Sequence, residues 1–151
     1  MSSFEREPQK LIISCRTIIK DNTGRFLLVQ RGPTDRYKPF SWEIPGGKMD
    51  QGENNKVQTA KREAMEEIGA DIKITKRLSS TSHVISDGII PEYQGALFLC
   101  FYFEAKLDPF YQEIKLSEDH INYKWVTLDE AKKLDLAQTS LDYFEKLAIE
   151  H

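Results

Sequence analysis

The strongest secondary-structure signal in this chain is a helical stretch from Asn55 to Ile68. Its apolar residues recur at intervals of three or four, which places them on one helix face: Val57, Ala60, Ala64 and Ile68. Asn55 is suited to cap the N-terminus of this helix, and Gly69 is suited to end it. A helix with one apolar face must cover an apolar surface, so the rest of the chain has to supply a sheet or further helices.

Stretches rich in β-branched, aromatic or alternating residues lie on both sides of that helix and predict strands. They span residues 11–20, 26–30, 72–81, 96–107 and 123–127. Asp21-Asn22-Thr23-Gly24 predicts a hairpin turn between the first two. Shorter amphipathic helices are expected over residues 128–133 and 140–149, the second capped by Thr139.

These elements alternate without a linker or an internal repeat, so we expect a single domain over residues 1–151. The fold class expected is α/β, with residues 1–10 as a loose lead-in. A formal charge of −3, from 21 basic and 24 acidic residues, argues against a binder of nucleic-acid polymers or acidic membranes.

Cysteine usage and hydropathy predict a cytoplasmic protein. Cys15 and Cys100 each lie in an apolar run and are expected to be buried free thiols, with a disulfide as the less favoured alternative. The longest apolar run, Ala96–Phe103, is far shorter than the roughly 20 residues that span a bilayer. The first residues lack the layout of a signal peptide.

The central helix also carries Arg62 and three glutamates, Glu63, Glu66 and Glu67. At about 100° per residue the glutamates fall within an arc of about 100°, away from the apolar stripe. Like charges at these spacings repel each other, and the last turn faces the negative end of the helix dipole. A solvated acidic face is the alternative, but we interpret the cluster as a cation site. Oxygen ligands without His or Cys suit Mg²⁺ or Mn²⁺ rather than zinc.

Upstream of the helix, Trp42-Glu43-Ile44-Pro45-Gly46-Gly47-Lys48 places two glycines side by side. Such a turn lets backbone groups approach a metal or a phosphate closely, although an ordinary turn has the same composition. Gly47, Glu53 and the run from Arg62 to Gly69 lie in one ordered string of glycines and charged residues. So many such residues in this order are improbable by chance.

The string from Gly47 to Ala70 resembles the Nudix box of MutT-like hydrolases, G-x5-E-x7-R-E-U-x-E-E-x-G-U, where U is aliphatic. The preceding Trp42–Lys48 segment is also typical of that family. One departure is that residues 54–61 place eight residues between Glu53 and Arg62, where the family pattern has seven. We place this one-residue insertion at the loop–helix junction, where it leaves the helical part of the box intact.

The resemblance implies a Nudix-type α/β/α sandwich with a mixed sheet, and hydrolysis of a diphosphate linkage in a nucleoside diphosphate joined to another group. A nucleoside triphosphate pyrophosphatase is one such enzyme. Glu63, Glu66, Glu67 and the Gly46 carbonyl would hold Mg²⁺, or Mn²⁺, and Arg62 would orient a glutamate. Gly47 and Glu53 would support these ligands. A nucleotide-type small-molecule substrate follows, and a homodimer is allowed.

The resemblance also implies that the general base is either a glutamate of the box or an acid on a late loop. In this sequence Glu118, followed by Asp119, is the favoured candidate, with a solvated acidic turn as the alternative. His83 and His120 are expected to be structural or exposed, because neither has the partners of a zinc site.

Substrate contacts are expected from Arg31, Arg36 and Lys48, which flank the box, although each is an ordinary surface charge in the alternative reading. Trp42 or Phe40 is a candidate for stacking on a base, with core packing as the alternative.

Two other functions stay open. One is a nucleotide-sensing module that keeps the fold without the chemistry. The other, ranked last, is an isoprenoid-diphosphate isomerase, which would need a reactive cysteine near the metal.

Overall fold

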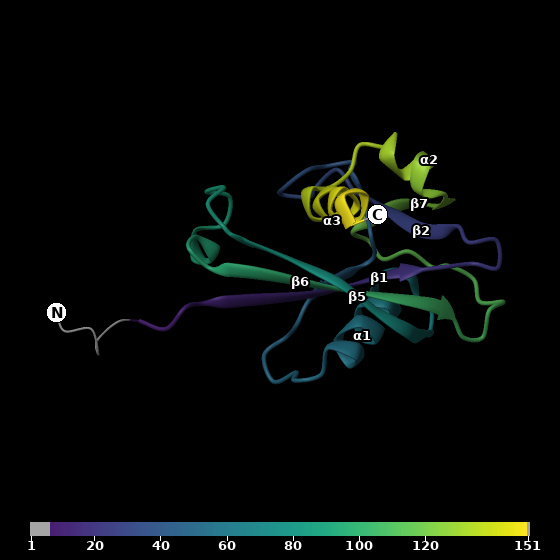
Figure 1. Cartoon of the computed structure of the whole chain (residues 1–151), viewed down its shortest axis with the longest axis horizontal. Coiled ribbons are helices and arrows are strands. Elements are labelled where there is room, and N and C mark those ends of the chain that lie inside the picture. Colours follow the sequence, from purple (N-terminus) through teal and green to yellow (C-terminus); the bar gives the residue numbers. More distant parts are fainter. Residues whose placement is uncertain (1–6, 151) are drawn as a thin grey trace.

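The computed structural model describes residues 7–150 (Figure 1). Over these residues, seven strands and three α-helices follow one another, with a short 3₁₀ helix, η2, at Pro91–Tyr93. Their bounds are β1 Leu11–Ile19, β2 Phe26–Arg31, β3 Trp42–Glu43, β4 Gly46–Lys48, α1 Lys56–Ile68, β5 Ile72–Val84, β6 Leu97–Leu107, β7 His120–Val126, α2 Leu128–Lys132 and α3 Gln138–Glu150. The predicted mixture of strands and helices is confirmed.

The strands form two sheets. The first has the order β4-β1-β6-β5 and is mixed, because β1 and β6 run parallel while the other neighbours are antiparallel. The second has the order β3-β2-β7 and is antiparallel throughout. In Figure 1, α1 lies on one side of the first sheet, and α2, α3 and the second sheet lie on the other. This is the expected α/β/α arrangement with a mixed sheet.

The turn at Asp21 forms as predicted, but the prediction that the strands on either side of it pair as a hairpin is wrong. Its carboxylate accepts hydrogen bonds from the backbone N–H groups of Thr23, at 2.8 Å, and Arg25, at 3.0 Å. Beyond one bridge between Lys20 and Phe26, however, β1 and β2 separate into different sheets. Both strands are largely buried, so each is paired inside its own sheet rather than forming an exposed ribbon.

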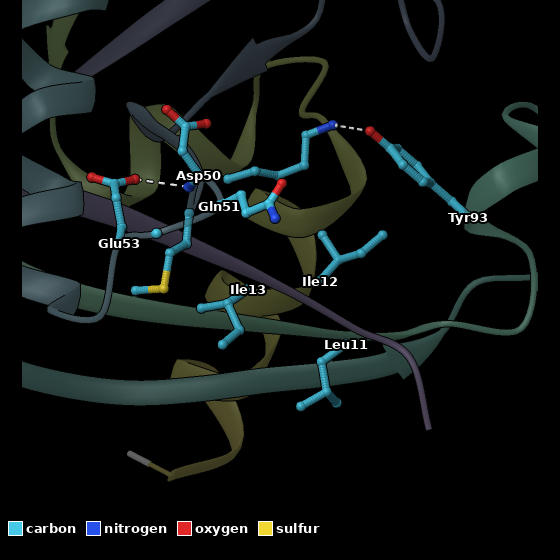
Figure 2. Close-up of a pocket in the computed structure, with 10 residues that line it drawn as sticks. Leu11, Ile12, Ile13, Asp50, Gln51, Glu53 and Tyr93 are labelled. Carbon is cyan, nitrogen blue, oxygen red and sulfur yellow. Dashed lines mark hydrogen bonds between the residues drawn. The ribbon is translucent and has the colours of Figure 1, made fainter. Parts of the chain in front are cut away.

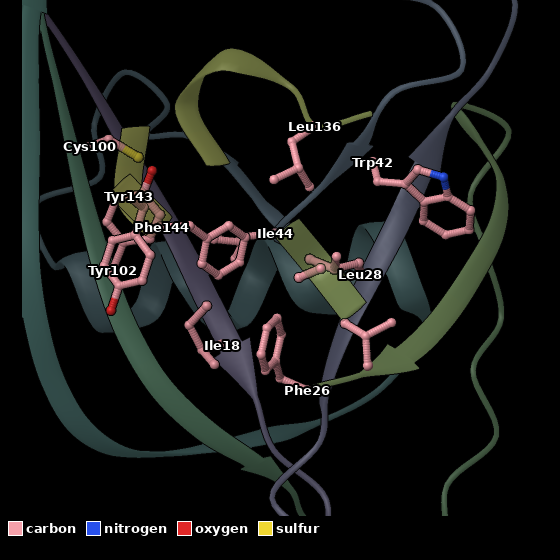
Figure 3. Packing of buried hydrophobic residues seen from close by; sticks show 12 residues of the cluster. Ile18, Phe26, Leu28, Trp42, Ile44, Cys100, Tyr102, Leu136, Tyr143 and Phe144 are labelled. Atoms are coloured by element: carbon pink, nitrogen blue, oxygen red, sulfur yellow. The ribbon is translucent and has the colours of Figure 1, made fainter. Parts of the chain in front are cut away.

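The apolar face of α1 packs as the sequence periodicity predicts. Ala64 and Ile68 join a cluster that includes Ile19 and Leu27. On the opposite side, Tyr143 of α3 stacks on Tyr102 of β6, with ring centroids 4.1 Å apart (Figure 3). The mixed sheet is therefore covered on both faces, and Cys15 and Cys100 are buried free thiols, as predicted.

Several boundaries differ from the sequence prediction, and β5 ends at Val84 rather than at residue 81. Helix α3 begins at Gln138, so Thr139 lies inside the helix and does not cap it. The Leu141 N–H donates a hydrogen bond to the carbonyl of Ala137, the residue before the helix. Strand β7 begins at His120, three residues earlier than expected. Of the predicted lead-in, residues 7–10 are exposed and outside regular structure, and residues 1–6 lie outside the described residues. Within residues 7–150, no helix combines the length and apolar character needed to cross a membrane.

Candidate active site

Strand β4 and helix α1 together position the glutamates of the box. Asn55 caps α1 by accepting hydrogen bonds from the N–H groups of the next turn, and Gly69 ends it with a left-handed backbone at φ +63°. Helix α1 begins at Lys56, after residues 54–55, where the one-residue insertion is predicted. The glutamates therefore stay in helical register, and the last turn of α1 faces β4.

Both glycines of β4 are required by close approaches. A Cβ atom on Gly47 would lie 2.6 Å from the Glu63 carboxyl carbon, and one on Gly46 would meet the backbone of β1 at Arg16. Gly46 also has φ +150°, which side chains disfavour. These contacts explain why two adjacent glycines precede the box.

The backbone of Gly46 is turned toward α1. The Thr17 N–H donates to the Pro45 carbonyl at 2.8 Å, and the Met49 N–H donates to the Ile13 carbonyl at 2.7 Å. Because bonding alternates along an antiparallel strand, the Gly46 N–H and C=O point away from β1. The N–H donates to Glu67 Oε2 at 3.0 Å. The Gly46 carbonyl therefore faces the same side as this carboxylate, as the prediction of a metal ligand requires.

Arg62 ties the remaining acids of the box together. Its Nε and Nη2 donate to the two oxygens of Glu53 at 3.0 and 2.8 Å, and Nη2 also donates to the Lys48 carbonyl at 3.0 Å. Nη1 donates to Glu63 Oε1 at 3.1 Å and to both Glu66 oxygens. The hydrogen bond from Arg62, together with that from the Asp50 N–H, lowers the pKa of Glu53 to about 2. Arg62 therefore orients acids on three sides of its guanidinium.

We expect Arg62→Lys to lower kcat by about 10–100-fold, the usual effect of removing a group that orients metal ligands. A lysine offers one ammonium and cannot replace the forked contacts to Glu53, Glu63 and Glu66. Steady-state kinetics over a Mg²⁺ titration would measure the change, with Lys61→Arg on the exposed side of the same helix as control. A kcat equal to that of the control would contradict the role.

Glu63 and Glu67 are carboxylates whose ionised forms are disfavoured. Burial raises the pKa of Glu67 well above its usual value, and the charge of Glu43 raises it further. Burial also raises the pKa of Glu63. Within residues 7–150, no lysine or arginine forms an ion pair with Glu67, whereas Arg62 pairs with Glu63 and Glu66. Oxygen donors in this electrostatic state fit a hard divalent cation, which would compensate the charge of both half-buried residues.

A buried network around Glu43, which the sequence did not reveal, lies next to Glu67. Glu43 Oε2 accepts from Arg31 Nε at 2.7 Å and lies 3.6 Å from Arg16 Nη1, while Glu43 Oε1 lies 2.9 Å from His120 Nε2. Burial acts to raise the pKa of Glu43, but Arg16, the His120 hydrogen bond and Arg31 together lower it to about 2. Of the two sequence alternatives for His120, the structural role fits, because this side chain is buried.

Ligand atoms of Glu43, Glu67 and His120 lie within 4.8 Å of one another and form a group that could hold a metal ion. However, both oxygens of Glu43 already accept hydrogen bonds, from His120 and Arg31. Glu43 is therefore engaged at both oxygens by Arg31 and His120, whereas Glu67 accepts the Gly46 N–H at one oxygen.

A cavity of about 430 Å³ lies beside β4, and one of the residues that line it, Gly47, packs against the Glu63 carboxylate. Gly47 and Lys48 line it from β4, and Arg16 and Arg31 line it from β1 and β2. Apolar and aromatic side chains form much of the remainder, including Phe98. Its size suits a small molecule, and its basic wall suits an anionic one.

Comparison with known proteins decides the family. The model of the NUDIX domain matches residues 11–147. This chain belongs to the Nudix family. It is 32% identical over 131 residues to the asymmetrical bis(5'-nucleosyl)-tetraphosphatase of Rattus norvegicus, covering 82% of this chain and 80% of that enzyme. This Nudix protein is accordingly a pyrophosphohydrolase.

Two further comparisons bear on fold and function. The Nudix chain is 31% identical over 116 residues to the ADPR responsive transcriptional repressor NtrR of Acinetobacter baylyi, covering 75% of this chain and 42% of that protein. The MutT protein of Methanosarcina mazei superposes with a TM-score of 0.76 at 24% identity, covering 96% of this chain and 98% of that one. The second likeness shows the fold.

The remaining candidate residues of this Nudix hydrolase take different positions. Glu118 and Asp119 are exposed on the loop before β7. That loop lies against the end of α1, because the Ser117 N–H donates to the Glu67 carbonyl at 2.9 Å. The location suits a late-loop base, which stays a prediction.

The predicted substrate contacts are less uniform. Lys48 lines the cavity, as does Arg31, although Glu43 and Asp35 hold the Arg31 guanidinium. Arg36 is exposed. Trp42 is only 7% exposed and packs in the core (Figure 3), with the Lys124 ammonium 5.0 Å from its ring centroid. Core packing, the alternative kept for Trp42, is what the structure has, so we withdraw it as a base-stacking residue.

Proposed function

We propose that this Nudix hydrolase cleaves a diphosphate linkage in a dinucleoside polyphosphate, with Mg²⁺ held by Glu63, Glu66, Glu67 and the Gly46 carbonyl. The observation that carries the proposal is the approach of Glu67 to the Gly46 backbone and of Glu63 to the Gly47 backbone, beside a cavity with basic residues in its wall. The substrate class is supported by the likeness to the tetraphosphatase of Rattus norvegicus over most of both chains.

In this reaction, water adds across one P–O–P linkage. One P–O bond breaks, a new P–O bond forms to the water oxygen, and the water proton passes to a base. Bound Mg²⁺, or Mn²⁺, would neutralise phosphate charge and help to align the attack. Arg62 keeps Glu63 and Glu66 in place, while Arg31 and His120 hold Glu43 behind Glu67.

Glu118 is our candidate for the base, with Asp119 and Glu63 as alternatives. This choice is supported by the hydrogen bond from the Ser117 N–H to the Glu67 carbonyl, which joins the loop that carries Glu118 and Asp119 to the end of α1. A base positioned there would contribute about 10²–10⁴-fold to the rate. The pH profiles of Glu118→Gln, Asp119→Asn and Glu63→Gln would distinguish the three, because only loss of the base removes its limb of the profile.

Two other functions fit the site less well. A sensing module has support from the likeness to the repressor NtrR, but a sensor does not need the complete set of glutamates. An isomerase that uses cysteine is disfavoured, because burial raises the pKa of Cys15 to about 11 and also raises that of Cys100. The homodimer and the cytoplasmic location stay predictions.

The test is product identification with Mg²⁺ and with Mn²⁺. We expect dinucleoside polyphosphates to be cleaved into two nucleotides, with ¹⁸O from labelled water in one product by mass spectrometry. Nucleoside triphosphates and ADP-ribose serve as comparison substrates. Turnover of none of these compounds with either metal would refute the enzyme proposal. Tight, metal-independent binding without products would favour the sensor.

A further inference from the structure

A second cavity lies beside the one described above, and the two share part of their walls. It measures about 380 Å³ and is formed by the start of β1 and the segment that follows β4 (Figure 2). Ile12, Lys48 and Tyr93 line both cavities. The Lys48 Nζ donates to the Tyr93 hydroxyl at 2.8 Å and lies 4.5 Å from the ring centroid. This contact therefore stands at the junction of two adjacent hollows.

The two cavities differ in chemistry. The larger one combines the aromatic Tyr37, His83 and Phe98 with basic groups, which suits a nucleobase followed by phosphate. The smaller one has the apolar Leu11 and Ile13 on one side and Asp50, Gln51 and Glu53 on the other (Figure 2). Acidic groups repel phosphate but accept hydrogen bonds from ribose hydroxyls, so this hollow suits an uncharged nucleoside.

Lys48 is placed to bind the part of a substrate that runs from one cavity to the other. Of the described residues that line the smaller cavity, it is the one cation, and it forms no ion pair with a carboxylate there or elsewhere in residues 7–150. Its backbone carbonyl is held by Arg62, so the residue is anchored directly beside the carboxylate cluster. An anionic chain that crosses the junction would pass this ammonium, on the strand whose Gly46 binds Glu67 and whose Gly47 packs against Glu63.

We infer that the two cavities hold the two nucleosides of one substrate, and that Leu11, Gln51 and Lys48 set a preference for two-ended polyphosphates over mononucleotides. The inference rests on the proposed function and adds the site of the second nucleoside. Each cavity alone is close to the lower end of the size range of small-molecule sites, so neither accommodates both nucleosides. A substrate with a free terminal phosphate would place its charge beside Asp50 and Glu53.

The test compares a dinucleoside tetraphosphate with the nucleoside 5'-tetraphosphate that lacks one nucleoside, because both carry the same number of phosphates. We expect the wild type to prefer the two-ended compound in kcat/KM. Leu11→Trp, at an exposed position of the smaller cavity, should raise KM for that compound by about tenfold with kcat unchanged, and leave KM for the one-ended compound within about twofold. Leu128→Trp on α2, also exposed, is the matched control.

Gln51→Lys provides an independent change of charge. An added ammonium in the smaller cavity should raise kcat/KM for the one-ended compound by up to about fivefold, as expected for an exposed charge pair. Equal efficiency of the wild type on both compounds, or a Leu11→Trp effect that matches Leu128→Trp or is the same for both compounds, would overturn the inference while the proposed function stands. Turnover of neither compound by the wild type would refute both.

Discussion

We expect Glu67→Gln to lower kcat by about 10²–10⁴-fold while making the protein more stable. Glutamine can still accept the hydrogen bond from the Gly46 N–H, but it has no charge with which to hold a cation. Because burial and Glu43 raise the pKa of Glu67 in the folded state, its ionisation opposes folding once the pH exceeds the unfolded value of 4.5. At neutral pH the wild type bears this destabilisation and the variant does not.

Thermal unfolding measures the stability half of this prediction. Without added metal, the Tm of Glu67→Gln should exceed that of the wild type at pH 7, by about 2–4 °C for each kcal/mol gained. The difference should shrink as the pH falls toward 4.5, where the wild-type carboxyl becomes neutral in both states. Mg²⁺ should raise the Tm of the wild type more than that of the variant. Glu145→Gln, the same substitution at an exposed site of α3, should change neither activity nor Tm. A variant that is inactive but less stable at pH 7 would contradict this electrostatic account.

The second large effect is expected from Glu43→Gln, which should lower the free energy of unfolding by about 3–5 kcal/mol. This carboxylate lies between Arg16 and Arg31, and its loss leaves the buried Arg16 guanidinium without its counterion and Arg31 with Asp35 alone. Urea denaturation would measure the change. The double variant Glu43→Leu/Arg31→Met should recover part of the loss, because it removes charge on both sides.

The pH dependence of the Glu43 contribution has the opposite sign to that of Glu67. Burial opposes ionisation of Glu43, but Arg16, His120 and Arg31 lower its folded-state pKa to about 2. Its contribution to stability is therefore complete above pH 4.5 and disappears as the pH falls toward 2. A Glu43→Gln protein with wild-type stability at pH 7 would show that the network is not held together by this charge.

The part of the site that the sequence predicts is the part encoded locally. Arg62, Glu63 and Glu67 belong to one helix whose cap, Asn55, and end, Gly69, are visible in the sequence, so their relative placement follows from helix geometry. Family membership then supplied the link to the Gly46–Gly47 turn.

The network behind Glu67 has no such local signal. Arg16, Glu43 and His120 come from β1, β3 and β7, in two different sheets, and meet only in the tertiary structure. The position of Glu43 within the Trp42–Lys48 motif was the one available hint. The hairpin prediction failed for a related reason. A turn sequence such as that at Asp21 fixes the local backbone, whereas the partners of the strands that follow are chosen by burial.

Strand β4 ends its sheet, and its outward backbone groups are those that a strand of another molecule would bind. In this protein the Gly46 N–H is taken by Glu67 and the Lys48 carbonyl by Arg62. Two side chains of the proposed reaction centre therefore also occupy part of an edge that would otherwise be free to pair with strands of other molecules and form β-aggregates.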